Sequence, residues 1–181
     1  EGVYSYYANI VQKVPECKII LYNFEKLSGY KFSVKIVEKL VNDFPQQMVG
    51  IKDSSYNLYE KLKIPNFMIF PGSETKLLKS LELGCSGIIS AICNVTAPLA
   101  RRVFDDFFNN KKQTLNQRLC AIREVFDKTN LISGLHSFLS FEDKKYKIVL
   151  PPLGLLSQKD EKKLMSELKK LDFYPEKNIA A

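Results

Sequence analysis

Lys52 stands at the end of a short apolar run, Met48–Ile51, that is typical of a strand buried on both faces. A lysine in that place is either a solvated strand end or a reactive amine held in a dry pocket. Only the neutral amine attacks a carbonyl carbon, and with an ordinary pKa of about 10.4 fewer than about one exposed lysine in a thousand is neutral at pH 7. Burial penalises the charged form and lowers that pKa. Lys52 is therefore a candidate reactive amine.

Other polar side chains follow the ends of the neighbouring apolar runs. The groups are Tyr22-Asn23, Lys52-Asp53-Ser54, Gly72-Ser73-Glu74 and Ser90. Taken singly, Tyr22 fits core packing, Glu74 fits a carboxylate at a helix N-terminus, and Ser54 fits a helix cap. A phenol can also transfer protons as a general acid or base. Their occurrence after successive strands points to a shared site.

The elements that must position these groups alternate between strand and helix. We predict strands at 17–23, 47–52, 66–70 and 85–90, and helices at 33–44, 56–64, 73–84 and 97–110. Beyond residue 111 the pattern is all helical, with helices at 114–130, 131–141 and 157–171. Short connections between alternating strands and helices predict a parallel sheet with right-handed crossovers.

Four parallel strands fit either a small doubly wound sheet or half of an eight-stranded barrel. A nucleotide-binding sheet needs a glycine-rich turn after a strand, and the sequence has neither common form of it. Polar residues that recur after strand ends match the carboxyl-terminal face of a barrel, where barrel enzymes hold their chemistry. We therefore predict an α/β fold of the barrel type.

Composition narrows the class of protein. The chain has 181 residues, is 45% hydrophobic and carries a net charge of +7, and its lysines alternate with acidic residues along helical faces. This pattern indicates solvated helices rather than a nucleic-acid surface, and no apolar window predicts a membrane span. Four widely spaced cysteines and one histidine, His136, predict reduced thiols in the cytoplasm and no metal site.

Five motifs in order, ILYN, LSG, GIKDSS, GSE and GCSGIISAICNV, resemble the dihydrodipicolinate synthase/N-acetylneuraminate lyase superfamily. These are class I pyruvate aldolases on a (β/α)8 TIM barrel. The resemblance implies the C-terminal half of that barrel, with strands five to eight in residues 1–111 and a C-terminal helical extension in residues 112–181. The opening EGVYSYYANI, which lacks a Met, is similar to the helix after the fourth strand, so we expect a portion of a longer protein.

The resemblance also implies roles for residues of the site. Lys52 matches the Schiff-base lysine, so that no cofactor is needed beyond the imine, and Tyr22 matches the proton-relaying tyrosine that contacts the pyruvate carboxylate. The positions that match substrate-binding residues are Ser54, Gly72, Glu74, Ile89 and Ser90. In the turn after Tyr22, Leu27 replaces the arginine common in the synthases, and Glu25 replaces a common proline.

Three functions follow from the resemblance. The leading hypothesis is a pyruvate-dependent lyase of a 2-keto-3-deoxy sugar acid, of the sialic acid or 2-keto-3-deoxygluconate type, because Leu27 in LSG is more similar to lyases. The alternatives are 4-hydroxy-tetrahydrodipicolinate synthase, or an inactive truncated barrel or assembly partner. The expected partners are pyruvate and an aldehyde or keto sugar acid, without nucleic acid or membrane. The complete protein is expected to be a homo-oligomer, since the family is commonly tetrameric.

Overall fold

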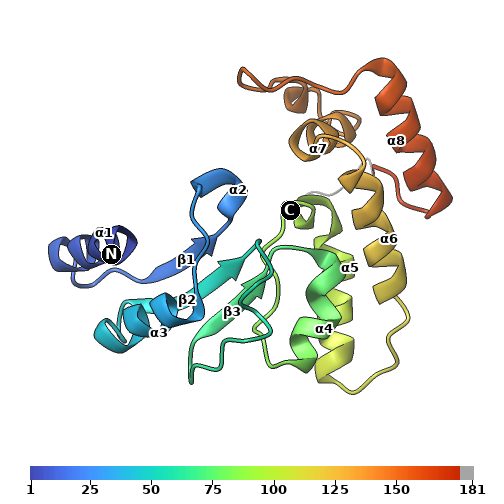
Figure 1. Cartoon of the computed structure of the whole chain (residues 1–181). Coiled ribbons are helices and arrows are strands. Elements are labelled where there is room, and N and C mark those ends of the chain that lie inside the picture. The colour runs from blue at the N-terminus through green and yellow to red at the C-terminus, as the bar shows by residue number, and fades with distance from the viewer. Residues whose placement is uncertain (176–181) are drawn as a thin grey trace. The chain divides into compact units, whose positions relative to one another are not determined.

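A computed structural model describes residues 1–175 of the chain, which form two compact units. The first unit is Glu1–Ser90, and the second comprises the described residues from Ala91 onward (Figure 1). The sequence predicts that the barrel portion ends at residue 111 and that a helical extension begins at residue 112. The boundary between the two compact units does not test that division, which stays a prediction.

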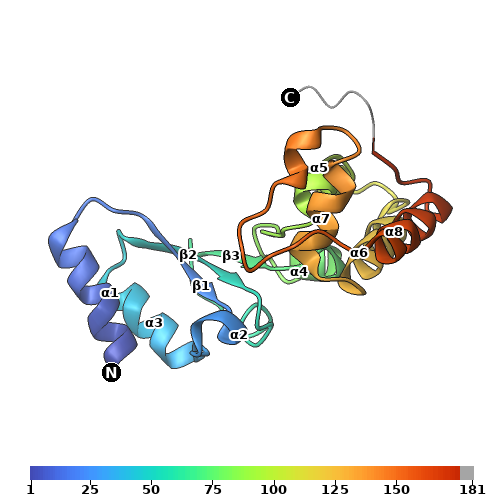
Figure 2. The ribbon, with the colours of Figure 1, turned by 90° about the horizontal axis from the view of Figure 1, so that it is seen from above.

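The first unit contains a three-stranded parallel sheet in the order β1-β2-β3. Its elements are α1 (Gly2–Lys13), β1 (Ile19–Asn23), α2 (Glu25–Ser28), α3 (Val34–Asp43), β2 (Met48–Asp53), β3 (Met68–Pro71), η1 (Glu74–Lys76) and α4 (Leu77–Glu82). Helices α1 and α3 lie side by side, and α3 contacts β2 (Figure 2). This arrangement confirms the predicted α/β class and the parallel order of the first three strands, although no helix lies between β2 and β3.

Alternation along the strands gives the sheet a buried face and an exposed face. Leu21, Ile51 and Ile69 point to the helical side and are at most 7% exposed. On the opposite side Ile20 is 44% exposed and Met68 is 38% exposed. Because side chains alternate along a strand, Tyr22 and Lys52 belong to the exposed face.

Helix α3 follows the predicted pattern closely. The hydroxyl of Ser33 accepts a hydrogen bond from the backbone N–H of Ile36 and so caps the first turn. Val37 and Leu40, three residues apart on one side of the helix, are fully buried. The cap and this apolar stripe fix the helix between the first two strands along the chain.

Two predicted elements are wrong. The segment 56–64 is not a helix, because the N–H groups of Leu58 and Tyr59 donate to a carboxylate oxygen of Asp53 instead of to backbone carbonyls. The segment 85–90 is not a strand, although Ser86 and Ile89 donate to carbonyls of β3. Gly87, at φ 139°, takes the backbone out of strand geometry between those two bonds.

The second unit is helical, as predicted. Its elements are α5 (Cys93–Phe108), α6 (Asn116–Asp127), α7 (Leu131–Leu139), η2 (Lys144–Lys147) and α8 (Gln158–Lys170). Helix α8 packs on α6 and α7, and its Leu164 and Leu168 are at most 2% exposed. Within residues 1–175, no helix is long and apolar enough to cross a membrane.

Candidate active site

Tyr22 and Lys52 meet at the carboxyl ends of β1 and β2. Their Cα atoms are direct partners in the parallel register, so both side chains leave the sheet at the same height and on the same face. The Lys52 Nζ lies 4.3 Å from the centroid of the Tyr22 ring. The predicted pairing of these two residues is therefore present in the structure.

This face of the sheet is open to solvent. Tyr22 is 42% exposed and Lys52 is partly exposed. The described residues alone do not enclose the amine, so by themselves they do not form the dry pocket that was one of the two alternatives for Lys52. A closed pocket around Lys52 would need further groups that cover this face of the sheet.

Directly behind Tyr22 and Lys52, the next residue of each strand points to the buried face. Asn23 and Asp53 are fully buried and are also direct partners in the register. The Asn23 amide Nδ2 donates to Asp53 Oδ1 at 2.7 Å, so a side-chain hydrogen bond crosses the two strands. A polar pair buried in this way requires complete hydrogen bonding.

Ser54 and Gly72 lie against each other after β2 and β3. The N–H of Gly72 donates to the carbonyl of Asp53, and the N–H of Ser54 donates to the carbonyl of Asn23. A Cβ atom on Gly72 would lie 2.2 Å from the Ser54 Oγ, so this contact requires glycine. The structure thus brings together Ser54 and Gly72, two residues of the predicted substrate-binding set.

Glu74 and Ser90 form a second contact within the predicted set. The Ser90 hydroxyl donates to Glu74 Oε2 at 2.7 Å, and Glu74 is fully buried. Ile89 is 37% exposed, and its N–H donates to the carbonyl of Pro71. The Glu74 carboxylate therefore links the turn after β3 to the end of the segment 85–90.

The sequence model of the Dihydrodipicolinate synthetase family matches residues 1–171. The chain belongs to this family. Among curated relatives, 4-hydroxy-tetrahydrodipicolinate synthase of Thermus thermophilus is 28% identical over 190 aligned residues, which cover 100% of this chain and 63% of the relative. The match places the whole described sheet and the helices up to α8 within the family's span.

Solved structures of other proteins share the fold. YagE, a prophage protein of E. coli K12 determined in complex with pyruvate, is 20% identical with a TM-score of 0.83 and covers 95% of this chain and 61% of its own. N-acetylneuraminate lyase of Fusobacterium nucleatum is 22% identical with a TM-score of 0.80, over 94% of this chain and 60% of its own. The chain thus spans about 60% of the length of such relatives.

Asn23 and Asp53 are among the polar residues noted at the strand ends, but no role was predicted for them. The signal was present in the sequence, because each polar residue directly follows a predicted site residue on a neighbouring strand. With a period of two, that next residue must face the helices. A polar side chain there, at two adjacent strand ends, indicates a cross-strand hydrogen bond.

Two ionisable groups close to this pair stay protonated at neutral pH. The pKa of Tyr59 is raised to about 12, mainly by burial and next by the hydrogen bond that its hydroxyl donates to Glu60. Burial also raises the pKa of the Cys85 thiol, which donates to the carbonyl of Tyr59. Neither group is suited to proton transfer at this sheet end.

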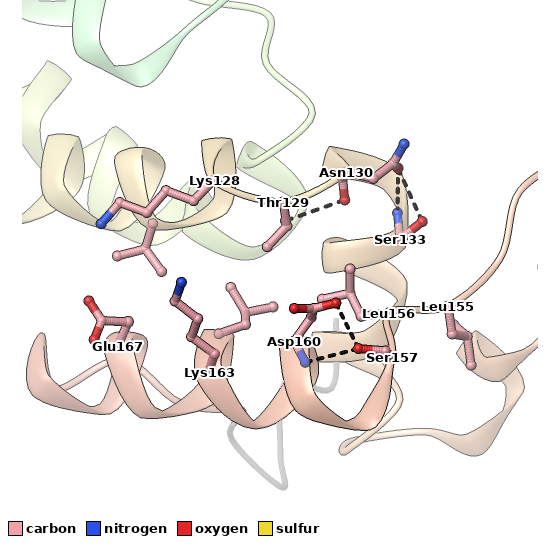
Figure 3. A pocket seen from close by; sticks show the side chains of 12 residues that line it. Lys128, Thr129, Asn130, Ser133, Leu155, Leu156, Ser157, Asp160, Lys163 and Glu167 are labelled. Atoms are coloured by element: carbon pink, nitrogen blue, oxygen red, sulfur yellow. Dashed lines mark hydrogen bonds between the residues drawn. The ribbon is translucent and has the colours of Figure 1, made fainter.

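Cavities occur in both units of the described chain. A cavity of about 270 Å³ in the first unit is lined by four tyrosines, one of which is Tyr22. A cavity of about 440 Å³ in the second unit lies between α6, α7 and α8, and none of the predicted site residues lines it (Figure 3). There Asn130 and Ser157 cap the N-termini of their own helices.

Within residues 1–175, no group of three or more His, Cys, Asp or Glu side chains is placed to hold a metal ion.

The Gly72→Ala variant is expected to lower the free energy of unfolding by about 1–3 kcal/mol, because an added methyl group in a close-packed contact forces the backbone to move. The Cβ would also lie 3.0 Å from the Ser54 Cβ, so rotation of the hydroxyl alone gives no relief. Urea unfolding measures the loss. Gly2→Ala, where a Cβ would meet nothing within 4 Å, is the control, and equal losses in both variants would contradict the clash.

Proposed function

We propose that this chain supplies the imine-forming lysine of a pyruvate-dependent class I aldolase. The observation that carries the proposal is the pairing of Tyr22 with Lys52 at the carboxyl ends of two adjacent parallel strands. In barrel enzymes this end of the sheet holds the catalytic groups. Membership in the Dihydrodipicolinate synthetase family, whose members are class I aldolases and lyases, supports the same chemistry.

The proposed reaction begins when the neutral Lys52 amine attacks the ketone carbon of pyruvate. The carbinolamine that forms loses water, and the carbon–nitrogen double bond of the resulting iminium withdraws electrons from the methyl carbon. Loss of a methyl proton then gives an enamine, which adds to an aldehyde. In the reverse direction, cleavage of a carbon–carbon bond releases the enamine, and water later frees the amine.

Tyr22 is proposed to transfer the protons of this sequence. Its ring lies within 4.3 Å of the lysine nitrogen, and its partly exposed position leaves it open to a substrate. A positioned acid or base of this kind contributes about 10²–10⁴-fold to a rate. Ser54, which directly follows β2 and lies two residues after Lys52, is proposed to contact the second substrate.

We further propose that the chain corresponds to strands five to eight of a (β/α)8 barrel. The parallel order β1-β2-β3 and the segment 85–90, which bonds to β3 through two N–H groups, support this assignment. In a closed barrel the inner face is filled by side chains from all strands, and the exposed face with Tyr22 and Lys52 would then be enclosed. Enclosure would provide the desolvation that a reactive lysine requires.

For the second substrate, the names of the relatives support the alternative over the sugar-acid hypothesis. The curated relatives include 4-hydroxy-tetrahydrodipicolinate synthases from Thermus thermophilus and Hydrogenobaculum, at 28% and 29% identity. We therefore place aspartate semialdehyde first as the acceptor. A sugar acid remains the second candidate, because the apolar Leu27 in the turn after β1 is 75% exposed and offers no charge to a carboxylate.

An inactive fragment or assembly partner is the third candidate. The exposed face of the sheet favours it, since an unenclosed amine is ordinarily protonated. This candidate predicts that the isolated chain forms no imine, whereas the first two predict an imine on Lys52 once the open face of the sheet is covered. Trapping of the imine separates these classes.

We expect pyruvate and borohydride together to leave a carboxyethyl group on Lys52, because borohydride reduces the imine to a stable secondary amine. Mass spectrometry of a digest locates the adduct. Lactate, which has no ketone, serves as the control ligand and should leave Lys52 unmodified. Modification spread evenly over the exposed lysines would overturn the proposal. Condensation with aspartate semialdehyde and cleavage of sialic acid or 2-keto-3-deoxygluconate then distinguish the acceptors.

A further inference from the structure

The buried side of the sheet end carries a polar network that the proposed reaction does not use directly. Asn23 and Asp53 each occupy the position after a proposed catalytic residue, and both are fully buried. Their side chains are joined by the 2.7 Å bond from Asn23 Nδ2 to Asp53 Oδ1. The exposed pair and the buried pair are thus attached to the same two strand ends, on opposite faces.

Every hydrogen-bonding atom of the Asn23 amide is engaged. Its Nδ2 also donates to Asn57 Oδ1 at 2.9 Å, and its Oδ1 accepts the N–H of Phe32 at 3.0 Å. The carbonyl of Asn23 accepts the N–H groups of Ser54 and Ser55. Asn23 therefore joins β1 to the loop after β2 and to the segment before α3.

Asp53 completes the network from the second strand. Its Oδ2 accepts the N–H groups of Leu58 and Tyr59 at 2.8 and 2.9 Å, and its carbonyl accepts the N–H of Gly72. The Asp53 carboxylate thus only accepts hydrogen bonds, and the side-chain amide of Asn23 is the donor from the neighbouring strand. The two residue types are not interchangeable one at a time, since either single exchange sets two donors or two acceptors against each other.

We propose that Asn23 and Asp53 are positioning residues for the imine chemistry, a proposal that rests on the proposed function. They fix the heights of the two strand ends relative to each other, and hence the 4.3 Å approach of the Lys52 amine to the Tyr22 ring. Reacting groups displaced by about 1 Å lose about 10²-fold in rate. A complete buried network is a rigid means of preventing such a displacement.

The test compares Asp53→Asn, Asn23→Asp and the double exchange that carries both changes. In Asn23→Asp two carboxylates face each other, and in Asp53→Asn the new NH₂ group faces either the Asn23 amide or the two loop N–H groups, so each single variant loses part of the network. In the double variant the new amide at position 53 can donate to the new carboxylate at position 23, while its oxygen still accepts the two loop N–H groups. The bond to Asn57 Oδ1 is not restored, so the expected recovery is partial. The net charge of the chain is also restored. The Ile69→Val variant, on the same buried face and outside the network, is the control for lost packing.

Two measurements are made on each variant, well below its own unfolding temperature. The first is the limiting rate of imine formation at saturating pyruvate, read by borohydride trapping. We expect about a 100-fold fall in each single variant with little change in the pyruvate concentration for half-saturation, recovery of at least about tenfold in the double exchange, and no fall in Ile69→Val. An unchanged rate in folded Asp53→Asn, or a fall that the double exchange does not reverse, overturns the proposal.

The second measurement is the NMR shift of the Lys52 ε-methylene protons, which an aromatic ring shields when they lie over its face. The shielding should be lost in Asp53→Asn and return in the double exchange. If the unmodified chain shows this pattern but no imine on Lys52, the proposed function fails while the positioning of the amine by the network is supported. Shielding that persists in Asp53→Asn contradicts the positioning role, whatever the outcome with pyruvate.

Discussion

The Lys52→Arg variant is expected to lose the entire borohydride-trapped pyruvate adduct. A guanidinium group stays protonated throughout the usable pH range, so it has no free electron pair to attack a ketone. Arginine keeps a positive charge over the face of the Tyr22 ring, where such a contact contributes only about 0.5–1 kcal/mol at an exposed site. The fold should therefore persist while the reactivity disappears, and mass spectrometry of the intact chain measures that loss.

Lys76 offers a matched control for this substitution. Its Nζ lies 5.6 Å from the centroid of the Tyr56 ring, so it also places an amine over a tyrosine in the first unit. The Lys76→Arg variant should retain the full adduct, because this lysine lies outside the proposed site. An adduct that survives in Lys52→Arg and falls in Lys76→Arg would show that a different amine reacts.

The pairing of Tyr22 with Lys52 was predictable because it depends only on strand order and on where each strand ends. Adjacent parallel strands bring their carboxyl ends to one edge of the sheet, and the apolar runs in the sequence mark those ends. The same reasoning grouped Ser54 and Gly72 in one predicted site, and in the structure these two residues lie against each other. Local patterns therefore sufficed for the exposed half of the candidate site.

Local patterns failed at 56–64 because a side chain there replaces the backbone as a hydrogen-bonding partner. The apolar spacing of 56–64 predicts a helix, but the Asp53 carboxylate takes the N–H groups that would begin it. The same carboxylate binds Asn23, a residue thirty positions away. Such competition depends on tertiary contacts, which hydrophobic periodicity does not report.

The exposure of Lys52 has a different origin. The expected desolvation requires groups on the open face of the sheet, and the described residues leave Tyr22 42% exposed there. The sequence of a strand end predicts which face a lysine occupies but not what covers that face. The reactivity of Lys52 is for this reason the property that most needs measurement.

The Phe126→Ala variant is expected to lower the free energy of unfolding of the second unit by about 3–5 kcal/mol, since removing a buried aromatic side chain loses its transfer free energy and leaves a cavity. Phe126 is fully buried in α6, and its ring centroid lies 5.7 Å from that of Phe138 in an edge-to-face arrangement. Such a pair adds about 0.5–1.5 kcal/mol beyond burial. The loss is large beside a typical domain stability of about 5–15 kcal/mol.

Phe108→Ala is the matched control, because this phenylalanine at the end of α5 is 59% exposed and contacts only the neighbouring rings of its own helix among the described aromatic pairs. Its removal should change stability by less than about 1 kcal/mol.

Hydrogen exchange followed by mass spectrometry separates the regions affected. In Phe126→Ala, exchange should accelerate in peptides from α6, α7 and α8, whose apolar side chains form one cluster with Phe126. Peptides from β1 and β2 belong to a different cluster, and they should keep their protection if the two units unfold separately. Equal acceleration in both sets would instead show that the chain unfolds as one cooperative body, in which case Phe126→Ala should also reduce the yield of the Lys52 adduct.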